Sequence, residues 1–155
     1  MVEIERKFLV VDETFKQQAV KQTRIVQGFL TTDPERTVRI RIKGNTGFIT
    51  IKGKSDAEGL ERFEWEKEIA STEAEALLKL CLPGTIDKIR YEVPLEDVVF
   101  EIDEFFGANE GLVVAEVELT HKQQKHPVPN WLGKEVTGEV KYYNSQLSKK
   151  PFKTW

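Results

Sequence analysis

Along most of its length this chain alternates charged and apolar residues with a period of two. The opening decapeptide MVEIERKFLV is the first example, and one of its faces carries Glu3, Glu5 and Lys7. Such alternation is the pattern of a β-strand whose other face lies against an apolar layer. Comparable runs follow at residues 37–43, 48–54, 61–69, 87–93, 100–105 and 114–119. Turn signals such as KGNTG and KSDAEG separate the runs, which predicts a sheet of about eight antiparallel strands.

Helical patterns are confined to a few segments. Residues 12–21 predict a short helix, and residues 144–149 predict one or two helical turns. Residues 71–80 predict a better helix, with Thr72 and Glu75 at capping-box spacing. We therefore expect an α+β fold that is mainly β, with helices packed outside the sheet. No repeat, low-complexity tract or linker interrupts the chain, so residues 1–155 are expected to form one domain.

The composition excludes several classes of partner. A net charge of −3 over 155 residues argues against a generally basic nucleic-acid-binding surface. No apolar run reaches the length of a membrane span, and the N-terminus lacks the apolar core of a signal peptide. The single cysteine, Cys81, is expected to be a small buried hydrophobic residue. We expect a cytoplasmic protein without nucleic-acid or membrane partners, and a homodimer is compatible with the sequence.

The charged residues come in like pairs on one strand face, as E-x-E or R-x-R. Successive residues on that face are separated by roughly 6.6–7 Å, so paired charges repel unless an opposite charge lies between them. Paired acids therefore favour cations, and paired bases favour a polyanion. In a β-sandwich the charged faces would point to solvent, whereas in a closed barrel they could line the lumen. The residues alone leave both architectures open.

The order of the motifs is more specific than any one of them. EIERKF contains the pattern E-x-E-x-K, and it is followed in order by QGFL, VRIRIKG, TIKGK, RFEWE, DKIRY, FEIDEFFG, AEVEL and WLGKEVTGEVKYYN. This series resembles the CYTH superfamily, the triphosphate tunnel metalloenzymes, and most of all its short bacterial members, several of which are inorganic triphosphatases. The resemblance implies an eight-stranded antiparallel closed barrel that forms a tunnel.

The resemblance also implies a role for each set of charged residues. The residues that match metal ligands are Glu3, Glu5, Glu116 and Glu118. The residues that match the basic triphosphate-binding set are Lys7, Arg39, Arg41, Lys52, Arg62, Lys88 and Arg90. Further acidic lining is expected from Glu64, Glu66, Glu101 and Asp103. The candidate catalytic residues are Lys88, Glu64, Glu66 and Asp103. Lys54 continues the parity of its strand, and Glu139 and Lys141 stand where the family is expected to have Asp and Arg.

The expected reaction is metal-dependent hydrolysis of inorganic triphosphate to pyrophosphate and phosphate, with two Mg²⁺ or Mn²⁺ ions per site. Adenylate cyclisation and thiamine triphosphate hydrolysis, both known in the superfamily, are the alternatives, together with a non-catalytic polyphosphate- or nucleotide-binding domain. Strand parity places Phe63, Trp65 and Tyr91 on the face opposite the charges, and Gln27 is the one amide expected to point inward. A lumen without aromatic partners favours inorganic triphosphate over ATP.

Overall fold

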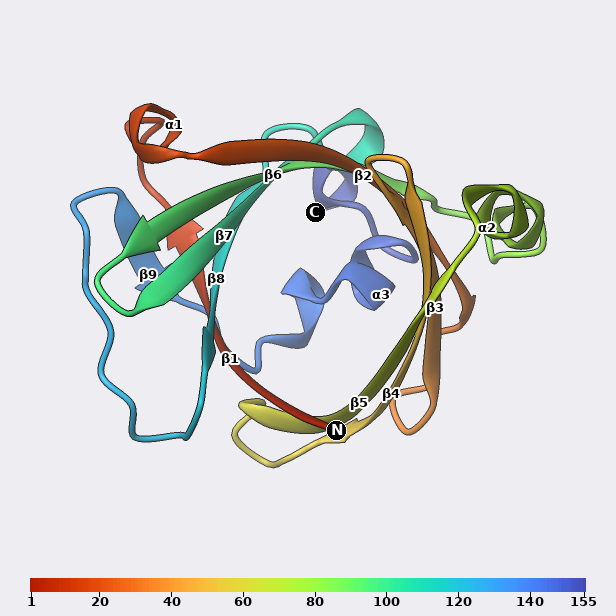
Figure 1. The fold of residues 1–155 in the computed structure, drawn as a ribbon, viewed down its shortest axis with the longest axis horizontal. Helices are drawn as coiled ribbons and strands as arrows, with labels where there is room; N and C mark the ends of the chain where they lie inside the picture. Colours follow the sequence, from red (N-terminus) through yellow and green to blue (C-terminus); the bar gives the residue numbers. More distant parts are fainter.

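Nine strands form one antiparallel sheet in the computed structural model, which describes residues 1–155. The strands are β1 (Val2–Val10), β2 (Lys21–Thr31), β3 (Thr37–Lys43), β4 (Thr46–Ser55), β5 (Glu61–Ile69), β6 (Ile86–Leu95), β7 (Val98–Phe105), β8 (Val113–Leu119) and β9 (Leu132–Glu135). Their order is β5-β4-β3-β2-β6-β7-β8-β1, and β5 also pairs with β1 (Figure 1). Eight strands thus close into the predicted barrel, while β9 pairs with β1 outside it.

The strand positions agree with the sequence prediction, and β5 coincides with the predicted run at both ends. One irregularity lies in β4, where the register against β5 shifts between Lys52 and Ser55. After this shift Lys54 is exposed, and Ser55 lines the lumen. The inward position that simple parity predicts for Lys54 is therefore wrong, because a bulge reverses the alternation at that point.

The regular helices are short: α1 (Phe15–Gln18), α2 (Ser71–Leu78) and α3 (Asn144–Leu147), with single 3₁₀ turns at Gly107–Asn109, Val140–Tyr142 and Phe152–Thr154. Helix α2 confirms the longer prediction, but its capping interaction differs. The Ala70 backbone N–H donates to the Glu73 carboxylate at 3.1 Å, so the predicted pairing of Thr72 with Glu75 is wrong. No helix is long and apolar enough to cross a membrane.

The larger apolar core lies on the outside of the barrel wall. Phe15 of α1 is fully buried with its ring 5.4 Å from that of Tyr91, and Trp131 packs at 5.4 Å from Phe100. The apolar strand faces therefore point away from the lumen, as the barrel alternative requires. The cover is incomplete, however: Phe63, on the face that parity predicted, is 47% exposed and is not covered by a helix.

A second core closes one end of the barrel. It joins inward-facing strand residues to the C-terminal segment, which we define as residues 136–155, and its members are Ile86, Phe105, Leu112, Val114, Val136, Tyr142 and Leu147. Figure 1 shows this segment, including α3, within the ring of strands. The sequence prediction placed helices outside the barrel and contained no such closure.

Gly47 allows α2 to lie directly on β4. A Cβ atom at this position would be 2.8 Å from the Ala74 Cβ and 2.9 Å from the Ala70 carbonyl oxygen, both in or next to the helix. Gly47→Ala is expected to destabilise the fold by about 1–3 kcal/mol, since helix backbone must move to make room. Thermal unfolding checks this, with Gly53→Ala as the control on the same strand. A smaller loss for Gly47→Ala than for Gly53→Ala would contradict it.

Candidate functional site

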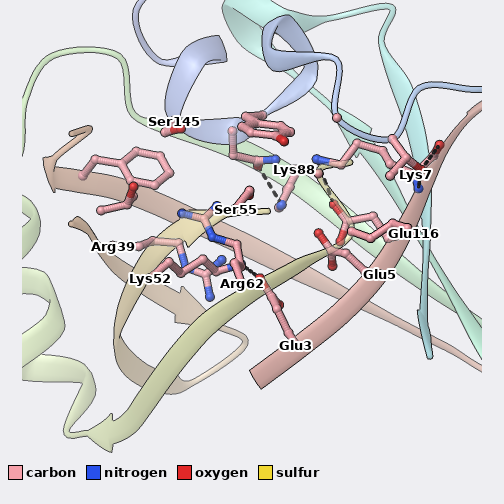
Figure 2. Close-up of a pocket in the computed structure, with 18 of the residues that line it drawn as sticks. Glu3, Glu5, Lys7, Arg39, Lys52, Ser55, Arg62, Lys88, Glu116 and Ser145 are labelled. Carbon is pink, nitrogen blue, oxygen red and sulfur yellow. Dashed lines mark hydrogen bonds and ion pairs between the residues drawn. The ribbon is translucent and has the colours of Figure 1, made fainter. Parts of the chain in front are cut away.

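Charged side chains line a cavity in the barrel lumen. The charged lining residues are Glu3, Glu5, Lys7, Arg39, Lys52, Arg62, Lys88, Arg90 and Glu116. All nine belong to the set that the sequence predicted, and they come from six different strands. Figure 2 shows Arg39, Lys52 and Arg62 grouped on one side, with Glu5 and Glu116 on the other. The predicted residues that do not line this cavity are Arg41, Glu64, Glu66, Glu101, Asp103 and Glu118.

Asp103 joins two of the buried bases. Its carboxylate accepts hydrogen bonds from the Arg90 guanidinium at 2.8 and 2.9 Å, and the Lys88 Nζ atom lies 2.8 Å away. All three side chains are buried. Burial alone would raise the pKa of Asp103, but Arg90 and Lys88 hold it well below its usual value. Burial and the nearby Arg90 charge lower the pKa of Lys88 to about 8, although Asp103 opposes this.

Arg39 and Arg41 share Glu66. The Glu66 Oε2 atom lies 3.3 Å from Arg39 and 3.5 Å from Arg41, and it accepts a hydrogen bond from Thr50 at 2.7 Å. Burial, followed by the charges of Arg39 and Arg90, lowers the pKa of Arg41 to about 10. The Nε atoms of Arg39 and Arg41 are both buried without an acceptor in the protein. One carboxylate therefore compensates two guanidinium groups only in part.

The remaining bases differ in how far they are neutralised. Lys52 lies 2.6 Å from Glu3 and 3.2 Å from Glu64, so it bridges β1 and β5. Arg62 instead donates two hydrogen bonds to the Gly53 carbonyl oxygen, at 3.0 and 2.8 Å. A neutral carbonyl accepts these bonds without cancelling the charge, so Arg62 brings a positive charge into the cavity.

The acidic side of the lumen is under mutual repulsion. Glu5 and Glu118 are direct cross-strand partners, and like charges placed opposite each other are unfavourable. Burial, then the charges of Glu116 and Glu3, raise the pKa of Glu5 to about 8. The pKa values of Glu3 and Glu118 are also raised, in each case first by burial. Burial opposes ionisation of Glu116 as well, but Lys7, at 3.5 Å, and Arg90 lower its pKa to about 2.

These carboxylates fit a hard divalent cation in chemistry. Their oxygen atoms are the ligands that Mg²⁺ and Mn²⁺ prefer, and a cation would relieve the repulsion between them. No group of three or more such side chains is gathered closely enough to hold a metal ion unaided. A metal at this site would need ligands from water or from a bound anion, which is common for Mg²⁺ and phosphate groups.

A closed barrel with bases and acids lining one lumen is the architecture that the motif order implied, and comparison with known proteins agrees. Residues 1–150 match the CYTH domain family. The chain belongs to the CYTH family.

Two curated relatives of this CYTH protein are named inorganic triphosphatases. The one from Acetivibrio thermocellus is 42% identical over 154 residues, covering 99% of this chain and 97% of that protein. The one from Nitrosomonas europaea is 36% identical over 152 residues, covering 96% and 97%. A crystal structure of an inorganic triphosphatase superposes with a TM-score of 0.68 at 33% identity, covering 94% of this chain and 93% of that one.

Part of the CYTH cavity was not predicted from the sequence. The C-terminal segment contributes Thr137, Gly138, Tyr143, Asn144 and Ser145, and β2 contributes Phe29. Two aromatic rings therefore face the lumen, contrary to the expectation that it would contain none. Alternation could not reveal the residues of the C-terminal segment, because that segment has no strand period. Phe29 could have been found, because it has the same strand parity as Gln27, the amide expected to point inward.

The two departures from the family pattern lie away from the cavity. Lys141 is exposed and its Nζ atom lies 4.5 Å from the centre of the Trp155 ring, while Glu139 is 3.8 Å from Lys134. Neither Glu139 nor Lys141 is among the residues that line the cavity. The Lys141 side chain thus contacts the C-terminal segment, and the Glu139 side chain contacts β9.

Glu5→Gln is expected to stabilise the metal-free protein at high pH. Because the folded-state pKa of Glu5 is about 8, above its ordinary value of 4.5, folding is favoured at low pH and this contribution is lost as pH rises through 8. The melting temperature in EDTA should therefore rise by at least about 5 °C at pH 8.5, and by little at pH 5. Glu75→Gln, on the exposed face of α2, is the control. An equal change in melting temperature at both pH values would contradict the raised pKa of Glu5.

Proposed function

We propose that this CYTH protein hydrolyses inorganic triphosphate to pyrophosphate and phosphate with the help of divalent cations. The observation that carries this proposal is the gathering of six bases and three carboxylates from six strands around one cavity. A linear triphosphate carries several negative charges in a small volume, and bases from several strands can surround it in a way that a flat patch cannot. The names of the two relatives support the same reaction.

The proposed triphosphate-binding residues are Lys7, Arg39, Arg41, Lys52, Arg62, Lys88 and Arg90. Among these, Arg62 donates to a neutral carbonyl and Arg39 shares Glu66 with Arg41, so we expect these two cavity-lining arginines to be the strongest phosphate ligands. Arg41 is not among the residues that line the cavity, so its contribution is mainly the positive electrostatic potential that its charge adds. Asp103 holds Lys88 and Arg90 in place, and Glu64 and Glu66 do the same for Lys52, Arg39 and Arg41.

CYTH triphosphatases are metal-dependent in general. In this chain Glu3, Glu5, Glu116 and Glu118 would hold Mg²⁺ or Mn²⁺, and we propose two ions per site. Such ions would supply positive charge that offsets the charge of the phosphate oxygens, and Lewis acidity toward water. The remaining roles belong to residues of the chain. Lys88 stabilises charge on the leaving pyrophosphate, and Glu64, Glu66 and Asp103 keep the bases oriented while the bond breaks.

Inorganic triphosphate is the preferred substrate in this proposal, because charged groups dominate the cavity lining. Phe63, Trp65 and Tyr91 lie on strand positions opposite to the lumen-facing charges, as parity predicted. The rings of Phe29 and Tyr143 do reach the cavity, so an organic tail would find some apolar contact there. That contact is smaller than the gain from phosphate oxygens, which bind several charged donors at once.

Phosphate release from inorganic triphosphate, ATP and thiamine triphosphate tests the proposed reaction. With Mg²⁺ or Mn²⁺ present, kcat/KM for inorganic triphosphate should exceed the other two values by at least about tenfold, and EDTA should abolish turnover. Pyrophosphate and phosphate should appear in equal amounts. Formation of cyclic AMP, or a preference for ATP, would favour the cyclase alternative, and binding without any turnover would favour a non-catalytic domain.

Arg39→Ala and Arg41→Ala should differ in a defined order. Arg39 lines the cavity and Arg41 does not, so Arg39→Ala should raise KM for inorganic triphosphate by about ten- to a hundredfold and Arg41→Ala by less. Arg41→Ala should also leave the metal-free melting temperature unchanged or higher, because it relieves repulsion with Arg39 and Arg90. Arg24→Ala, an exposed arginine paired with Asp87, is the matched control. A sharp fall in melting temperature for Arg41→Ala with unchanged kinetics would make Arg41 a structural residue.

A further inference from the structure

The C-terminal segment reaches the buried base Lys88 through the side chain of Asn144. Its Oδ1 atom accepts a hydrogen bond from the Lys88 Nζ atom at 2.9 Å and a second from the Gln27 Nε2 atom at 2.9 Å. Gln27 is completely buried, and Lys88 is 2% exposed. Asn144 itself lines the cavity. One amide therefore connects α3 with β2 and β6 at the charged lumen.

The chemistry of the partners fixes which way the Asn144 amide points. A lysine ammonium can only donate, so the atom that faces it must be the amide oxygen. Because Gln27 meets that same oxygen, its own NH₂ group must be the part that faces Asn144. The Gln27 Oε1 atom is then left buried without a donor, as the structure shows. The orientation of both amides follows from Lys88 and does not depend on distinguishing nitrogen from oxygen.

This orientation leaves the Asn144 Nδ2 group available in the cavity. No protein acceptor receives a hydrogen bond from it, and it is not among the buried unpaired atoms. A neutral amide donor that faces a cavity rich in bases is suited to a phosphate oxygen, which accepts hydrogen bonds from neutral as well as charged donors. We propose that Asn144 has two roles, binding a terminal or bridging phosphate oxygen through Nδ2 and positioning Lys88 through Oδ1. This inference rests on the proposed triphosphatase function.

The backbone around α3 is held firmly enough for such a role. Leu147 is fully buried in the core that closes the barrel. A Cβ atom at Gly84, which has a positive φ of 99°, would overlap the Ser148 carbonyl group, so the chain after α3 lies directly against the loop before β6. The Tyr143 ring lies 5.0 Å from the Lys7 Nζ atom on the other side of Asn144. The segment thus forms a fixed wall of the site that brings neutral donors to a charged barrel.

Two substitutions separate the two roles. Asn144→Asp keeps an oxygen for Lys88 but replaces the NH₂ donor with an anionic oxygen that repels phosphate. It should raise KM for inorganic triphosphate at least about tenfold while kcat stays within about threefold of the wild-type value. Asn144→Ala loses both groups, so kcat should fall at least about tenfold as well. Lys149→Ala, an exposed change in the same segment, is the control and should match the wild type in both constants.

A direct binding measurement tests the donor role of Asn144 without depending on turnover. Calorimetric titration of inorganic triphosphate into the full-length chain in EDTA, where turnover is abolished, should give a Kd at least about tenfold weaker for Asn144→Asp than for the wild type. A wild-type protein that binds triphosphate without hydrolysing it would overturn the proposed function, and the Kd ratio would still decide the donor role of Asn144. Unchanged KM and Kd in Asn144→Asp would overturn that donor role. Unchanged kcat in Asn144→Ala, with or without a lower melting temperature, would overturn the positioning role. A wild-type protein that does neither overturns both proposals.

Discussion

Burying many charges inside one barrel is possible here because each buried base has a carboxylate within reach. The clearest case is Asp103, which receives two hydrogen bonds from Arg90 and lies 2.8 Å from Lys88. Removing one member of a buried charge network leaves its partners uncompensated, and the cost is then several kcal/mol. The network around Asp103 therefore holds β6 and β7 together and sets where two of the lumen bases lie. The pairs that involve Lys52 and Glu66 repeat this arrangement around the barrel.

The buried charges are not all compensated equally, and the positions with incomplete compensation are those that suit ligands. Burial, and after it the charges of Glu116 and Glu3, raise the pKa of Glu5, which also faces Glu118 across the strand pair, so a negative charge is unfavourable at that point. Arg62 donates only to a carbonyl, and Arg39 shares one carboxylate with Arg41, so positive charge stays partly uncompensated there. A cation on the first side and a polyanion on the second would each lower the energy of the folded chain, so ligand binding and stability are linked.

Much of this arrangement could be predicted from the sequence because a strand repeats every two residues. Strand parity predicts the charged face of each strand to be the lumen face, and nine of the predicted residues do line the cavity. Parity does not separate these from residues of the same faces that stay out of the lining, such as Arg41 and Glu66. The prediction also fails where the period fails. Because of the bulge after Lys52, Ser55 faces the lumen in place of Lys54. The position of the C-terminal segment is fixed by long-range packing of Val136, Tyr142 and Leu147. No local pattern encodes that packing.

The two sources of lining residues have different physical consequences. The strands supply charges, which attract any compact polyanion and discriminate weakly between one phosphate compound and another. The C-terminal segment and β2 supply Asn144, Ser145, Tyr143 and Phe29, whose amide, hydroxyl and aromatic groups depend on geometry and shape. In this fold, affinity would come from the barrel, while selectivity would come from a segment that is free of the constraints of strand pairing. Changes in that segment can therefore alter which triphosphate is accepted while the charged network that holds the barrel together stays intact.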